Sequence, residues 1–150
     1  MPGADQAPFR PDQSRTLRAL VGRLIPASAE FGVPGADDET IFADILTTLQ
    51  PDTGPVSALL HTLAADAGGD FPALPAADRD ATYQARMGDP GLVAAITATL
   101  LCYYRDDRVM VSLGMEPRPP FPKGFEVEEG DWSLLDPVRA RPRLWRDAPP

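Results

Sequence analysis

The sequence has little of what enzymes use for chemistry. It contains one cysteine, Cys102, and one histidine, His61, so neither an internal disulfide nor a structural zinc site is available. It contains no Gly-x-Ser-x-Gly motif, no phosphate-binding glycine loop and no Glu-x-x-His pair. These absences remove the usual signatures of serine hydrolases, P-loop enzymes and carboxylate-bridged metal sites.

The remaining candidates for catalysis are weak. Asp106 and Asp107 stand between Arg105 and Arg108, and this cluster is more simply read as a salt-bridged corner at a helix end. A single histidine in a helix is usually a packed or surface residue, and a lone cysteine is usually a small buried apolar residue. We therefore expect no catalytic residue, no cofactor site and no metal site in this chain.

The sequence also lacks an excess of positive charge and any long apolar run. The formal net charge is -8, which argues against nucleic acid and against anionic lipid as partners. No segment approaches the length of a membrane span, and residues 1–11 contain no apolar run typical of a signal peptide. We expect a cytoplasmic protein without membrane insertion, with export alongside a partner as the alternative.

The apolar residues that are present recur at helical spacing in five segments. Breaks at proline and glycine separate these segments, so the sequence predicts an all-α fold, a small bundle of about five helices. The first helix is expected to begin at Asp12 or Ser14 and the third at Pro55. The fifth, the clearest, has Asp89 as its N-cap and Pro90 as its first residue. The apolar residues that recur in it at helical spacing over more than three turns are Leu92, Val93, Ile96, Leu100, Tyr103 and Tyr104. Around a helical domain over 12–116 we expect a flexible N-terminus, 1–11, and a long C-terminal tail, 117–150.

The tail differs in composition from the rest of the chain. It opens with a proline-rich stretch from Pro117 to Gly124 and holds both tryptophans, Trp132 and Trp145, so we expect an extended arm. Such an arm can wrap a partner, wrap its own body or remain loose. Tryptophan and arginine dominate interface energetics, which favours the partner. The expected contact residues are Phe121, Phe125, Trp132, Leu135, Arg139, Arg141, Trp145 and Arg146, with Tyr103 and Tyr104 as second choices.

The order of several short motifs resembles the gluconate 2-dehydrogenase subunit 3 family. The motifs are the helix and Ile-Pro of Leu17 to Pro26, then Pro34-Gly35-Ala36, then Phe71 to Pro75 with Asp78-Arg79, then Tyr103-Tyr104, and finally Gly114-Met115 leading to Pro119 to Gly124. The resemblance covers roughly residues 14 to 125.

The resemblance implies a non-catalytic small subunit. Its partner would be a large FAD-binding catalytic subunit of the glucose–methanol–choline type, which oxidises a sugar or another alcohol. This chain would hold no flavin and would stabilise that subunit in a heterodimer or larger assembly. One alternative is an assembly or export chaperone for the same flavoprotein. Another is a stand-alone small helical enzyme that uses Asp106 and Asp107, or His61.

Overall fold

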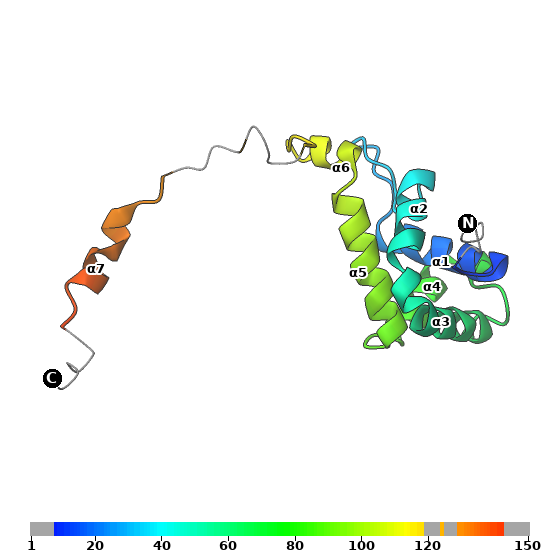
Figure 1. The fold of residues 1–150 in the computed structure, drawn as a ribbon. Coiled ribbons are helices and arrows are strands. Elements are labelled where there is room, and N and C mark those ends of the chain that lie inside the picture. The colour runs from blue at the N-terminus through cyan, green and yellow to red at the C-terminus, as the bar shows by residue number, and fades with distance from the viewer. Residues whose placement is uncertain (1–7, 119–123, 125–128, 143–150) are drawn as a thin grey trace, which may run out of the picture. The chain divides into compact units, whose positions relative to one another are not determined.

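The structure, a computed structural model, describes residues 8–118, 124 and 129–142 (Figure 1). The chain divides after Pro117 into two units, residues 1–117 and 118–150. All regular elements of the described residues are helical, apart from an isolated antiparallel bridge between Ser28 and Val33. The predicted all-α class is therefore confirmed. No helix among the described residues is long and apolar enough to cross a membrane.

The first unit contains the five predicted helices and one more. They are α1 (Pro11–Leu24), α2 (Glu39–Thr48), α3 (Thr53–Asp66), α4 (Ala76–Gln84), α5 (Pro90–Tyr104) and α6 (Asp107–Ser112). Two short 3-10 helices, Gln50–Asp52 and Phe71–Ala73, precede α3 and α4.

The first residues of the helices can be compared with the helix starts that the sequence predicts. Asp38 caps α2 and Asp89 caps α5, where the Asp89 carboxylate accepts from the backbone N–H of Gly91 at 2.8 Å. The predicted start of α1 was wrong, because Pro11 occupies its first position and Arg10 is the N-cap. Pro55 is the third residue of α3 rather than the first. Both prolines are tolerated because the first four N–H groups of a helix have no partner within it.

The core of the first unit forms where α5 packs against α3, α2 and α1. The inner side of α5 consists of Gly91, Leu92, Ala95, Ala98, Thr99, Cys102 and Tyr103. Of the apolar residues with helical spacing, Leu92 and Tyr103 are thus buried, whereas Val93, Leu100 and Tyr104 are exposed. Small residues lie inside because α5 approaches its neighbours closely. Phe9, which precedes α1, also belongs to this core.

The second unit contains a short helical stretch in the part that is described. A 3-10 helix, Trp132–Leu135, continues into α7 (Asp136–Arg139), and the carboxylate of Asp131 accepts from the backbone N–H of Ser133 at 3.0 Å. Residues 132–139 are therefore helical rather than extended, and the extension of the rest of the tail stays a prediction. Local capping by aspartate and a proline in the first turn of α7 favour helix there. Phe121, Phe125, Trp145 and Arg146, four of the predicted contact residues, lie outside the described residues.

Candidate partner-binding surface

The fifth helix is apolar on all sides, but the described residues cover it on one side only. No charged residue occurs from Pro90 to Tyr104. Opposite the buried side runs an exposed row with helical spacing, the α5 stripe, made of Val93, Thr97, Leu100, Leu101 and Tyr104. Leu100 is 45% exposed, Val93 52%, and Leu101 and Tyr104 each 54%. A helix that is apolar all round is normally buried all round, so the stripe lacks a covering element within the described part of the first unit.

A groove accompanies the stripe along most of α5, from Pro90 to Leu101. Its volume is about 420 Å³, and Val93, Thr97 and Leu101 line one side of it. Thr48, Leu49 and Asp52, from the end of α2 and the turn that follows, also line it. The groove is thus an apolar depression with one exposed carboxylate at its margin. It can accept apolar side chains from another protein.

The two adjacent tyrosines at the end of α5 have different surroundings. Tyr103 is buried, and its hydroxyl donates to the carbonyl oxygen of Pro34 at 3.2 Å. Tyr104 is exposed and meets the Tyr103 ring edge-on, with 5.3 Å between the ring centroids. Both line a hollow of about 220 Å³ together with Phe31, Val33, Val109, Ser112 and Leu113. Of the two predicted contact residues, only Tyr104 is therefore available to a partner over most of its ring.

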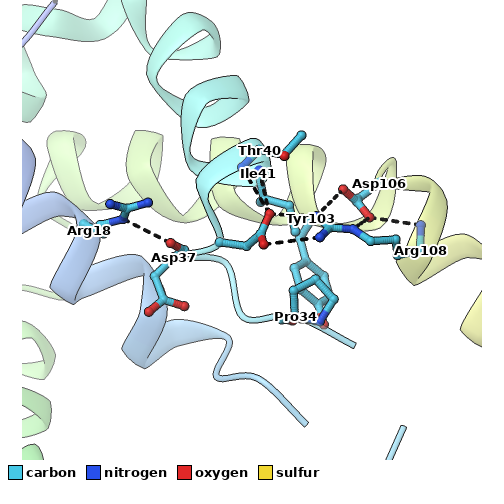
Figure 2. A network of polar contacts seen from close by, with 9 residues as sticks. Arg18, Pro34, Asp37, Thr40, Ile41, Tyr103, Asp106 and Arg108 are labelled. Carbon is cyan, nitrogen blue, oxygen red and sulfur yellow. Dashed lines mark hydrogen bonds and ion pairs between the residues drawn. The ribbon is translucent and has the colours of Figure 1, made fainter. Parts of the chain in front are cut away.

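Ion pairs fix the end of α5 next to this surface. Arg108 of α6 donates to two carboxylates (Figure 2). One belongs to Asp106, the N-cap of α6, and the other belongs to the residue that caps α2. The latter is Asp38, 2.7 Å from Arg108 Nη2. Arg105 donates in the same way to both carboxylate oxygens of Asp44 on α2. The cluster around Asp106 is thus a salt-bridged corner that joins α2, α5 and α6.

These contacts change the titration of the carboxylates. Hydrogen bonds from the Arg108 guanidinium lower the pKa of Asp38 and of Asp106 below the ordinary value of 3.8, against a smaller opposing effect of burial. The Arg105 guanidinium lowers the pKa of Asp44 in the same way. Both carboxylates that Arg108 contacts therefore stabilise the fold in their charged form.

We expect Arg108→Met to lower the free energy of unfolding by about 1 kcal/mol at pH 7, the upper value for partly exposed ion pairs. A carboxylate whose pKa is lowered by folding contributes stability above its ordinary pKa, and this contribution is lost as pH falls through the folded value. The difference between variant and wild type should therefore shrink as pH drops below 3.8. Urea unfolding at pH 7, 5 and 3 measures this difference.

Arg15→Met, which removes the exposed pair with Asp70, is the control. Its free energy of unfolding should stay within about 0.5 kcal/mol of the wild-type value at all three pH values. A difference for Arg108→Met that does not depend on pH would contradict this account.

The other candidate catalytic residues do not converge. His61 is exposed on α3. Cys102 is buried beside the Thr48 hydroxyl, with Sγ and Oγ1 3.3 Å apart, and burial raises the pKa of its thiol. Among the described residues, no three His, Cys, Asp or Glu side chains are grouped so that they could hold a metal ion.

The described tail segment presents a second apolar surface. Trp132 is 69% exposed and Leu134 73%, and Leu135 and Val138 are also exposed. Of the predicted contact residues here, Arg139 pairs with Asp136 at 3.3 Å, and Arg141 is exposed. Sequence reasoning identified Trp132 and Leu135 but not Leu134 or Val138. It did not identify the α5 stripe as an exposed side, although the lack of any charge over fifteen residues was a usable signal of two apolar sides.

Comparison of this chain with protein-family models, with curated proteins and with solved structures found no match.

Proposed function

We propose that this chain is a non-catalytic subunit that binds and stabilises a larger partner protein through the α5 stripe. The observation that carries the proposal is the stripe itself, an exposed apolar side on the helix around which the core is built. Contiguous exposed apolar surface on a folded domain typically marks a binding site for protein or ligand. Covering four large side chains of this kind contributes on the order of several kcal/mol to binding.

The groove and the charge favour a particular kind of partner surface. A partner that buries the stripe needs an apolar patch, and helix-in-groove docking fits a row of residues spaced at i, i+4, i+7 and i+8. The exposed Asp52 lines the groove, and the whole chain carries a net charge of -8. A basic rim around the apolar patch would therefore complement this side and speed the encounter.

The partner we propose is a large FAD-binding oxidoreductase subunit that acts on a sugar or another alcohol. This part rests on the motif order from Leu17 to Gly124, which resembles small subunits of such enzymes. The geometry is compatible with it, because the candidate catalytic residues are dispersed or engaged in ion pairs. In this arrangement the partner performs the chemistry, and the present chain stabilises it.

Purification of the full chain from its native host tests the proposal. We expect a stoichiometric complex whose absorbance shows the bands of bound flavin. Recovery of the chain alone would contradict the whole proposal, and a stoichiometric partner without flavin would contradict its identity as a flavoprotein. A flavoprotein that the chain binds while it folds, but that is free of the chain once mature, would favour the role of assembly chaperone.

The tail segment provides a second, linked contact, and its removal should be measurable. Exposed Trp132, Leu134 and Val138 are joined to the first unit by the chain itself, and linking two contacts typically raises overall affinity by about 10²–10⁴-fold. Deletion of residues 118–150 should therefore weaken partner binding at least 100-fold and abolish co-purification. Circular dichroism should still show a folded helical unit, since the core residues all precede the deletion. Full retention of the complex would show that the tail takes no part.

A further inference from the structure

A separate polar hollow lies beside α1. Its volume is about 280 Å³, and its lining consists of Arg18, Ala19, Gly22, Arg23, Asp37, Ala76 and Arg79. These residues come from α1, from the loop before α2 and from the start of α4. Three of the seven are arginines, in a chain whose acidic residues outnumber its basic ones by 22 to 14. Such a local reversal of charge raises the question of what the arginines bind.

The three guanidinium groups are engaged to different degrees. Arg23 is neutralised by Asp80, to which it donates twice at 2.6 Å. Arg18 uses only its Nε, which donates to the backbone carbonyl of Asp37 at 3.0 Å (Figure 2), and its guanidinium lies 5.0 Å from the centre of the Phe42 ring. Its two terminal nitrogens have no partner among the described residues. Arg18 therefore presents a positive charge to the hollow, and its stacking on Phe42 holds the guanidinium in place.

Arg79 is the least satisfied of the three. It makes no hydrogen bond or ion pair with any described residue, and its Nε is buried without an acceptor. Leaving a buried donor unpaired costs stability, and the cost is larger for a charged group. Buried unpaired polar atoms are few in folded proteins, and each calls for a physical reason. A ligand in the hollow cannot reach this buried Nε, but the terminal nitrogens of Arg79, which lines the hollow, also lack a partner among the described residues and can donate to an anionic group.

Asp37 adds an opposite charge that is held in a defined position. A Cβ atom at Gly22 would lie 2.8 Å from Asp37 Cγ, and one at Gly35 would lie 2.5 Å from Asp37 Oδ1. Neither glycine has a positive φ, so their requirement is for space. Asp37 is an exposed residue, but its carboxylate lies in a slot beside Gly22 and Gly35 and accepts no hydrogen bond from any described side chain.

We propose that this hollow binds a small α-amino acid, with its carboxylate on Arg18 and Arg79 and its ammonium on Asp37. Arginine forks match a carboxylate in two-point hydrogen bonding, and Asp37 supplies the complementary charge for the ammonium group. The volume is below the roughly 300–1,000 Å³ of drug-sized pockets, which suits a molecule of a few carbons. Phosphate suits it less, because its greater negative charge would face Asp37. The inference is independent of the proposed partner.

An NMR titration of the full ¹⁵N-labelled chain with glycine tests this site, with acetate and inorganic phosphate as comparison ligands. We expect saturable shifts of the amide signals of Gly22, Ala76 and Arg79, and binding of glycine at least fivefold tighter than that of acetate, which lacks the ammonium group. Arg79→Met should weaken glycine binding about tenfold or more. Asp37→Asn, which keeps the shape of the side chain in its slot, should abolish the preference for glycine over acetate.

Arg15→Met is the matched control, because Arg15 lies on α1 but pairs with Asp70 and does not line the hollow. It should bind glycine as the wild type does. The absence of saturable shifts with glycine would overturn the proposal. Tighter binding of phosphate than of glycine would also overturn it, and would indicate a plain anion site. Equal binding of glycine and acetate would remove the role of Asp37 and with it the amino-acid specificity.

Discussion

Leu100→Lys combined with Leu101→Lys should weaken binding of the larger partner at least 100-fold while leaving the isolated chain folded. Both leucines belong to the α5 stripe and are about half exposed in the free chain, so their replacement opens no large cavity. In the complex, two ammonium groups would instead be buried without counter-charges, which costs several kcal/mol. A loss of about 2.8 kcal/mol already corresponds to 100-fold in affinity. Co-purification and a titration of the purified partner measure the effect.

The control must add the same charge elsewhere on the first unit. Ala58 and Ala65 are exposed on α3, and their double replacement by lysine adds two positive charges outside the stripe. This control should bind the partner within a few-fold of wild type. If both double variants bind equally well, the stripe is not the interface. If the α5 variant loses its helical circular dichroism, Val93→Lys, a single change on the same stripe, separates a folding defect from a binding defect.

The difficulty of predicting this surface lies in the composition of α5. Apolar periodicity locates a buried side only when the opposite side is polar, and here both sides are apolar. Large residues such as Leu100 share the helical spacing of Leu92 and Ile96, so spacing alone does not separate the exposed side from the buried one. The structure instead buries small residues such as Ala95 and Ala98, because they permit close approach of the neighbouring helices. The sequence therefore predicted the existence and the ends of α5 but not its orientation.

Contacts between residues far apart in the sequence could not be predicted either. The pairing of Asp106 with Arg108 spans two residues and follows from the capping of α6. The pairing of Arg108 with Asp38 spans 70 residues, and nothing in a single sequence specifies it. The same holds for the hollow that brings Arg18 and Arg79 together. By contrast, the short helix at 132–139 had local signals, since Asp131 is a good N-cap and a proline lies in the first turn of α7.

Gly91→Ala should destabilise the first unit, although it adds only one methyl group. A Cβ atom at this position would lie 2.3 Å from the carbonyl oxygen of Pro55 and 2.9 Å from Cβ of Leu59. The nearest obstacle is backbone, which cannot rotate away as a side chain can, so α3 and α5 must move apart along their whole contact. Overpacking of this kind typically costs about 1–3 kcal/mol, which corresponds to a fall in melting temperature of roughly 4–20 °C for a unit of this size. Thermal unfolding followed by circular dichroism measures it.

Gly54→Ala is the matched control, because it makes the same chemical change in α3 with no atom within 4 Å of the new Cβ. Replacing glycine by alanine in a helix without steric conflict typically stabilises by about 0.4–1 kcal/mol, so this variant should melt at or above the wild-type temperature. Equal melting temperatures for the two variants would show that α3 and α5 do not approach as closely as the structure has them. A selective loss for Gly91→Ala would support the close approach that buries the small residues of α5 and leaves its large ones facing outward, which is the arrangement on which the proposed interface depends.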